Sequence, residues 1–555
     1  MKQQGGNVVG RLAVIKNIAW GSSEQTKKAL SNLFGKADAT SVKEKNNASD
    51  EANNQSNNKK GDHPPGERTS LQRFGLLAGP LAFLLILLFV SPTGMGPEAQ
   101  AVLASTAWVA IWWITEAVPI PVTSLLPIVL FTVTGAVETS VASSYADNTI
   151  FLFLGGFIIA LAMEKWNLHK RIALSIIAFV GTSTERLILG FMVATGFLSM
   201  WISNTATAMM MMPIGLAIIA HASASTNENL QQSNFGKGLM LGIGYSASVG
   251  GLGTLIGTPP NTIFAGVIDK MYGIDISFAK WMLFGVPLSI FLMAIVWFYL
   301  VKIAFKPEMK QLPGGKEVID EERAQLGRMS IEERRVLYVF VFAAFFWITR
   351  TFLPVEFIKN NVNDTTIAII AAVLLFVIPS KKTSTGTLMT WTDTKNVPWG
   401  ILLLFGGGLA IADGFKQSGL ALWIGEQLYA LNNIPLWLVI GIVATLVLFL
   451  TEVTSNTATA TMMFPIMAAL ATALGVHPYG LMIAAGIAAS CAFMLPVATP
   501  PNAIVFGSGL LKIQDMMKAG IWINLFCIFL ITAAVYFLLP FVWGIDLHVL
   551  PEIFR

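Results

Sequence analysis

Apolar runs separated by short polar segments fill the chain from about residue 74 to its C-terminus. The runs are more numerous than full membrane crossings need to be, and several are short or interrupted by glycine and proline. Lipid tolerates irregular backbone only where it faces protein or a water-filled cavity. The pattern therefore predicts an all-α polytopic membrane protein, with about 11 transmembrane helices and two re-entrant hairpins.

The composition supports a membrane protein. Hydrophobic residues make up 54% of the chain and charged residues 12%, and the mean hydropathy is +0.65. Soluble chains usually carry about twice that charged fraction. This balance excludes a cytosolic enzyme with a small anchor, and it makes membrane lipids the surroundings of most helices.

The N-terminal segment differs from the rest of the chain. Residues 1–73 hold 12 Lys and Arg against 7 Asp and Glu, and residues 38–68 have few large apolar side chains. We expect residues 1–71 to form a polar, largely disordered leader on the cytoplasmic side, because Lys and Arg resist translocation. Its mixed charges, without interleaved aromatic residues, argue against nucleic-acid binding.

The charges of the loops predict the topology. The segment 302–335 carries eight Lys or Arg and should be a cytoplasmic connecting loop. The stretch after Trp543 has two acidic residues and only Arg555 as a basic one, so the C-terminus should be extracellular. Ends on opposite sides of the cell membrane require an odd number of crossings, which agrees with about 11.

Three motifs occur twice in the same order, which divides the chain into a first repeat half at 72–301 and a second at 336–555. The repeated pairs are Phe-Leu-Phe-Leu-Gly-Gly at 151–156 with Leu-Leu-Leu-Phe-Gly-Gly at 402–407, Ser-Asn-Thr-Ala-Thr at 203–207 and 455–459, and Thr-Pro-Pro-Asn at 258–261 and 499–502. The predicted topology makes these inverted repeats. In such transporters the substrate site lies near the membrane midplane, between the repeats.

The repeated motifs have the chemistry of an ion and anion site. Ser, Asn and Thr side chains can donate to a carboxylate or turn oxygen atoms toward a hard cation. Each Thr-Pro-Pro removes backbone donors, which leaves carbonyl groups free to bind a cation. The alternative interpretation is that one motif is a helix cap and the other a kink. Polar groups at membrane depth are costly unless used, and their duplication favours the site.

Other polar residues give fewer indications. Glu116 and Glu452 lie in apolar runs and are candidates for proton or cation handling, or for a structural role. Cys491, Cys527 and the five histidines have no metal-ligand spacing, and we interpret both cysteines as packing residues. No plausible nucleophile and base lie together in the apolar runs, so we expect no enzyme and no organic cofactor. A channel is less compatible with paired compact sites than alternating access.

The paired Ser-Asn-Thr and Thr-Pro-Pro-Asn motifs resemble those of the divalent anion/sodium symporter family. The stretches 111–117, 250–260 and 451–461 are especially similar to the sodium-dependent dicarboxylate transporters of Gram-positive bacteria. The resemblance runs from about residue 72 to the C-terminus. It implies a homodimer with a scaffold and an elevator-type transport domain, and sodium-coupled uptake of C4 dicarboxylates such as succinate, fumarate or malate.

The resemblance also implies the site residues. Six residues would contact the substrate: Asn204, Thr205, Asn456, Thr457, Thr499 and Pro500. The first sodium site would use Ser199, Ser203, Asn204 and the backbone near Gly257. The second would use Thr451, Thr454, Asn456 and the backbone near Ala498.

Sodium dependence also has a physical reason. The motif segments contain no Lys or Arg, so a buried dianion would lack a fixed countercharge there. Bound sodium ions would neutralise it, and the two ligands would then stabilise each other. The alternatives within transport are a sodium-independent dicarboxylate exchanger and a carrier of another divalent anion such as sulfate.

Overall fold

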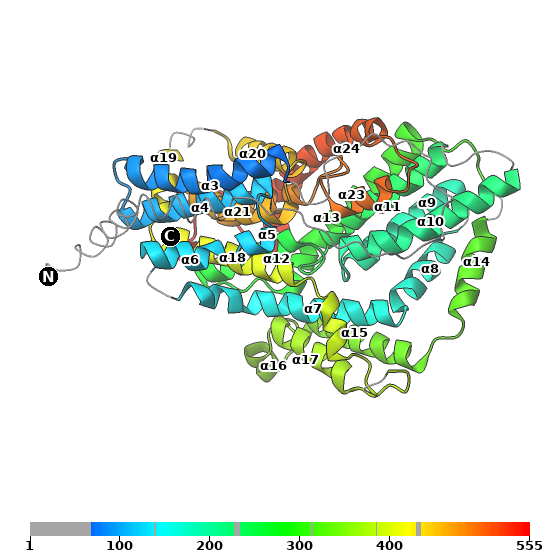
Figure 1. Ribbon diagram of the computed structural model, residues 1–555. Coiled ribbons are helices and arrows are strands. Elements are labelled where there is room, and N and C mark those ends of the chain that lie inside the picture. Colours follow the sequence, from blue (N-terminus) through cyan, green and yellow to red (C-terminus); the bar gives the residue numbers. More distant parts are fainter. Residues whose placement is uncertain are drawn as a thin grey trace, which may run out of the picture. The chain divides into compact units, whose positions relative to one another are not determined.

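The computed structural model describes residues 68–137, 140–181, 183–226, 233–311, 315–383, 386–428 and 434–554. Contacts divide the chain into two units, residues 1–70 and residues 71–555. The helices below belong to the second unit, apart from the first residue of α3 (Figure 1). The predicted leader lies almost entirely outside the described residues.

The described residues form helices and no strand, as predicted. The first half contains α3 (Ser70–Phe89), α4 (Pro97–Thr115), α5 (Ile120–Thr123), α6 (Leu126–Thr134), η1 (Val141–Ala146), α7 (Asn148–Lys165), α8 (Leu168–Val180), α9 (Thr184–Ser199), α10 (Asn204–Thr226), α11 (Asn234–Gly251), α12 (Pro259–Tyr272), α13 (Phe278–Phe298) and η3 (Tyr299–Ala304). The connecting segment 302–335 contains a further helix, α14 (Gly315–Leu326).

The second half begins with the helix after the basic loop. It contains α15 (Ile331–Thr349), α16 (Glu356–Asn361), α17 (Asp364–Val377), η4 (Trp391–Asn396), α18 (Trp399–Gln417), α19 (Leu420–Leu428), α20 (Leu436–Thr451), α21 (Asn456–Ala473), α22 (Pro478–Ala489), α23 (Pro500–Phe506), α24 (Ile513–Ala533), η6 (Ala534–Leu538), α25 (Leu539–Trp543) and η7 (Glu552–Phe554).

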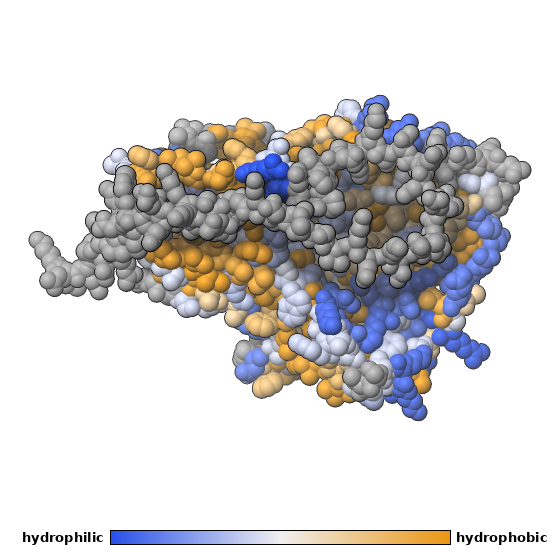
Figure 2. Space-filling view, viewed as in Figure 1, coloured by the Kyte–Doolittle hydropathy of each residue, from blue (hydrophilic) through white to orange (hydrophobic). Residues whose placement is uncertain are grey.

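Several helical segments are long and apolar enough to cross a membrane. Among the described residues six meet this criterion, namely Ser70–Phe89, Val141–Lys165, Asn204–Ser223, Phe278–Ala304, Trp399–Gln417 and Ile513–Trp543. Figure 2 shows apolar residues over broad parts of the visible surface. Leu77, Phe179 and Phe529 are largely exposed, as expected of side chains that face lipid. A multi-pass membrane protein is therefore confirmed, while the number of about 11 crossings stays a prediction.

The two halves repeat one arrangement of helices. In each, a pair of helices (α9 and α10, or α20 and α21) meets at the Ser-Asn-Thr motif, and a broken helix follows (α11 and α12, or α22 and α23). The break lies before the prolines, because Pro259 and Pro500 each start the second segment. Proline suits the first turn of a helix, where its missing N–H would have no partner.

Packing places the two broken helices against each other. α11 packs against α23 and α12 against α22, so each segment of one broken helix contacts a segment of the other. α9 packs on α11 in the first half, and α20 packs on α22 in the second. Every residue of α22 is buried, which is expected of an apolar helix in the middle of a large protein. α22 consequently lies in the interior of the protein.

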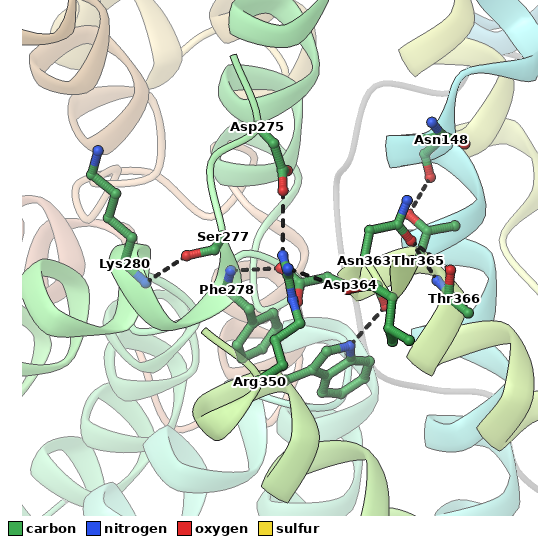
Figure 3. A network of polar contacts seen from close by, with 12 residues as sticks. Asn148, Asp275, Ser277, Phe278, Lys280, Arg350, Asn363, Asp364, Thr365 and Thr366 are labelled. Carbon is green, nitrogen blue, oxygen red and sulfur yellow. Dashed lines mark hydrogen bonds and ion pairs between the residues drawn. The ribbon is translucent and has the colours of Figure 1, made fainter. Parts of the chain in front are cut away.

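A polar network near the start of the second half joins α15, α17 and α13, as Figure 3 shows. Nε of Arg350, just after α15, donates to Oδ1 of Asp364 at the start of α17, over 2.5 Å. Asp364 also accepts from the backbone N–H of Phe278 at 2.7 Å. Arg350 and Asp364 are buried, whereas the third charged member, Asp275, is 69% exposed at its side chain.

Candidate functional site

The first hairpin tip joins α9 to α10 and brings three predicted ligands together. Ser199, the last residue of α9, is completely buried, and its hydroxyl donates to the carbonyl oxygen of Ala247 at 2.6 Å. The amide of Asn204 fits with its nitrogen toward the carbonyl oxygens of Ala247 and Gly257, each 3.1 Å away. Side chains of the tip thus bond directly to both sides of the first break.

The second hairpin tip repeats this geometry with a different hydroxyl residue. Thr451 ends α20, and its Oγ1 lies 2.7 Å from Oδ1 of Asn456 and 2.9 Å from the carbonyl oxygen of Ala489. Ala489 is the last residue of α22, as Ala247 lies near the end of α11. The tip again bonds to the segment that precedes the break.

The remaining predicted sodium ligands have local roles in the structure. Ser203 caps its own helix, because its Oγ accepts from the backbone N–H of Ala206 at 3.2 Å. The hydroxyl oxygens of Thr454 and Thr459 lie 2.6 Å apart. The cap interpretation of the Ser-Asn-Thr motif therefore holds for Ser203, whereas Ser455 makes no side-chain cap bond. Ala498 is buried in the second break.

Five of the six predicted substrate contacts are at least partly exposed. Asn204 and Thr205 are partly exposed at the first tip, and Asn456 and Thr457 are partly exposed at the second. Pro500 is exposed, while Thr499 is 4% exposed and its hydroxyl oxygen accepts from the backbone N–H of Asn502 at 3.4 Å. The four tip residues are thus equally placed in the two repeats.

The two breaks also meet. The hydroxyl oxygens of Thr258 and Ser490 lie 3.4 Å apart and both residues are buried. Glycine makes the close approach of the first break possible, because a Cβ on Gly251 would lie 2.9 Å from the Gly257 carbonyl oxygen. A Cβ on Gly250 would lie 2.2 Å from the Gly196 carbonyl oxygen, so that glycine serves tight helix packing.

Glu452 has the structural role that was one of its two interpretations from the sequence. Its Oε1 accepts from the backbone N–H groups of Phe493 at 2.8 Å and Met494 at 2.9 Å, and its Oε2 accepts from Leu495 at 3.1 Å. Nδ2 of Asn524 on α24 donates to Oε1 at 2.6 Å. The carboxylate therefore ties the second tip to the second break.

The first repeat lacks this carboxylate and uses a backbone carbonyl. Met200 stands at the position equivalent to Glu452, and its carbonyl oxygen accepts from the Thr254 hydroxyl at 2.5 Å. The other embedded acid, Glu116, is exposed and ends α4 with a φ of 47°, which agrees with a role at a helix end. For Glu452, the indication in the sequence was an acidic residue directly after Thr451.

The arrangement offers neutral oxygen atoms. Among the described residues no three His, Cys, Asp or Glu side chains group as metal ligands. Cys491 and Cys527 are buried and free of any disulfide. Hydroxyl, amide and carbonyl oxygens, which the two tips and breaks supply, are the ligands that hard cations prefer. The site is therefore chemically suited to an alkali cation beside an anion.

The chain is similar in sequence to known sodium-dependent transporters. The family described as "Sodium:sulfate symporter transmembrane region" matches residues 72–547. The sodium-dependent dicarboxylate transporter SdcS of Staphylococcus saprophyticus is 52% identical over 481 residues, which covers 86% of this chain and 93% of that protein. SdcS of Staphylococcus aureus is 53% identical over 485 residues, with the same coverage.

Two solved structures have similar folds. The YdaH transporter of Alcanivorax borkumensis has a TM-score of 0.52 at 13% identity, covering 85% of this chain and 98% of that one. MtrF of Neisseria gonorrhoeae has a TM-score of 0.54 at 12% identity, covering 86% and 95%. At that identity the likeness concerns the fold.

Proposed function

This chain belongs to the sodium:sulfate symporter family, and we propose on that basis that it is a sodium-dependent dicarboxylate transporter. The observation that carries the proposal is its 52% identity to SdcS, a protein named as such a transporter, over 86% of this chain. Sodium is the coupling ion. The finer proposal is inward symport of the C4 dicarboxylates succinate, fumarate and malate.

We propose that the two hairpin tips form the transport site. Asn204 and Thr205 from the first tip and Asn456 and Thr457 from the second would contact the substrate carboxylates, with Thr499 and Pro500 at the second break. The partial exposure of all four tip residues supports this assignment. None of these segments carries Lys or Arg, so bound sodium ions must supply the positive charge that a buried dianion requires.

Two sodium sites would lie behind the substrate. Ser199, Ser203, Asn204 and the carbonyl group of Gly257 form the first, and Thr451, Thr454, Asn456 and the carbonyl group of Ala498 form the second. The matching placement of Ser199 and Thr451 against the carbonyl oxygens of Ala247 and Ala489 supports a pair of equivalent sites.

We propose an elevator mechanism, in which hairpins and broken helices move together. Hydrogen bonds from each tip to its own break support this, because they join the two elements into one unit. The N-terminus would be cytoplasmic, the C-terminus extracellular, and the transporter a homodimer in the cell membrane. The basic segment 302–335 supports the orientation.

Radiolabelled succinate uptake into proteoliposomes tests the function. We expect uptake with an inward sodium gradient and none with potassium. Uptake that is driven by internal succinate without sodium would instead indicate an exchanger. Preferential competition by sulfate over fumarate and malate would indicate a carrier of inorganic divalent anions, which the family description also covers.

A further inference from the structure

Two buried asparagines occupy the same place in the two repeats, and the transport site proposed above makes no use of them. Asn261 is the third residue of α12 and Asn502 the third residue of α23, each after two prolines. Both residues are 0% exposed. A polar side chain at such a depth is costly unless its groups are bonded, so the partners of each amide define its role.

Asn261 bonds to the carbonyl groups of the first break. Its Nδ2 lies 3.2 Å from the carbonyl oxygen of Gly251, 3.3 Å from that of Leu252 and 2.8 Å from that of Thr254. Carbonyl groups at the end of a helix have no intrahelical donor. The asparagine amide supplies the donors that the broken backbone lacks.

Asn502 does the same in the second break. Its Nδ2 lies 3.0 Å from the carbonyl oxygen of Ala492 and 3.1 Å from that of Leu495. In an ordinary capping box, the side chain at this position reaches back to accept a hydrogen bond from a backbone N–H. In both repeats the asparagine side chain instead donates to carbonyl groups of the break.

The oxygen atoms of the two amides have no comparable bonds. Oδ1 of Asn261 and Oδ1 of Asn502 are both buried, and neither has a hydrogen-bond partner among the described residues. The amide nitrogen is therefore the atom through which each side chain acts on its break.

We infer that Asn261 and Asn502 are positioning residues, whose NH₂ groups hold the two breaks in the shape that binds sodium. Holding the carbonyl groups of 251–254 and 492–495 fixes the loops that end at Gly257 and Ala498, the proposed backbone ligands. This inference rests on the proposed function. It assigns the Asn of each Thr-Pro-Pro-Asn motif to the cation sites, through the backbone and without contact to the ion.

Asparagine and aspartate have nearly the same shape, which gives a sharp test. In Asn261→Asp and Asn502→Asp an oxygen replaces the donating nitrogen and faces the carbonyl oxygens, so the bonds become repulsions. We expect the sodium concentration for half-maximal succinate uptake to rise about tenfold or more, since two or three hydrogen bonds are lost. Half-saturation by succinate at saturating sodium should change much less.

A matched control and a second readout accompany these variants. Asn234→Asp makes the same change at a partly exposed position away from the breaks, where Nδ2 donates to the Lys306 carbonyl oxygen, and should leave the sodium dependence unchanged. The rise of the unfolding temperature on adding sodium to purified protein reports cation binding without transport. This rise should need more sodium in both Asp variants than in the control.

An unchanged sodium requirement in the Asp variants would overturn the inference. A lower requirement would also overturn it, because Oδ1 would then be a cation ligand. If an Asp variant does not fold, Asn→Ala removes both donors without adding a charge, and an unchanged sodium requirement in that variant overturns the inference equally. Wild-type protein that sodium stabilises but that takes up no succinate would refute the proposed function alone.

Discussion

The Thr451 hydroxyl lies between two acceptors, Oδ1 of Asn456 at 2.7 Å and the carbonyl oxygen of Ala489 at 2.9 Å. One hydroxyl has one hydrogen to donate, so it cannot satisfy both acceptors fully. A cation beside these three oxygen atoms would resolve the competition. At Ser199 in the first repeat the amide nitrogen of Asn204 faces the hydroxyl oxygen instead, so that hydroxyl is free to donate to the carbonyl oxygen of Ala247.

Replacing the tip asparagines should abolish transport without unfolding the protein. Asn204→Ala and Asn456→Ala each remove a proposed ligand of both sodium and substrate, so we expect sodium-driven uptake below about 1% of wild type. Asn234→Ala, at a partly exposed position outside the motifs, is the control. Uptake near the wild-type rate in either tip variant would remove that residue from the site.

Glu452→Gln should weaken the attachment of the second tip to the second break. Glutamine offers one oxygen where the carboxylate uses two, and its NH₂ group would face backbone donors. We expect a loss of about 1–3 kcal/mol in the free energy of unfolding, seen as a lower unfolding temperature. Glu116→Gln, at an exposed helix end, should be neutral. A Glu452→Gln variant with normal stability and impaired sodium binding would assign Glu452 to the cation instead.

Arg350→Ala should be strongly destabilising. It leaves the buried Asp364 carboxylate without its cation, which typically costs about 3–5 kcal/mol. Asp275→Asn should cost less than about 1 kcal/mol, because Asp275 is largely exposed. Thermal unfolding of both variants in detergent measures the difference, and equal unfolding temperatures would show that the Arg350 and Asp364 pair adds little.

Protonation of His477 should lower the free energy of unfolding in acid. It caps α22 through Nδ1, which accepts from the backbone N–H of Tyr479, and burial together with the nearby Lys280 lowers its pKa to about 4. The pKa of unfolded histidine is about 6.5, so the unfolded chain binds more protons between these values. The contribution of His477 is therefore complete above about pH 6.5 and is lost as the pH falls toward 4.

The variant His477→Asn tests this contribution. Asparagine also caps helices but does not titrate. Between pH 7 and pH 4.5 the unfolding temperature of the wild type should fall further than that of the variant. Parallel decreases would show that His477 does not cause the acid sensitivity.

Local pattern was sufficient for part of this structure. Apolar runs predicted the helices, and the duplicated motifs predicted where α9 meets α10, where α20 meets α21 and where the two helices are broken. The ties between distant segments could not be read in the same way. Glu452 meets Phe493, and Arg350 meets Asp364, only because the packed helices bring those residues together. The direction in which Asn261 and Asn502 donate likewise depends on backbone that is neither helix nor strand.

Reciprocal binding of sodium and succinate to the purified protein tests whether the two ligands are coupled. Coupled sites require that each ligand strengthens the binding of the other by the same factor. We predict that succinate affinity rises steeply with sodium concentration and not with potassium, and that succinate increases the binding of radioactive sodium. Succinate binding that is independent of sodium would contradict the account.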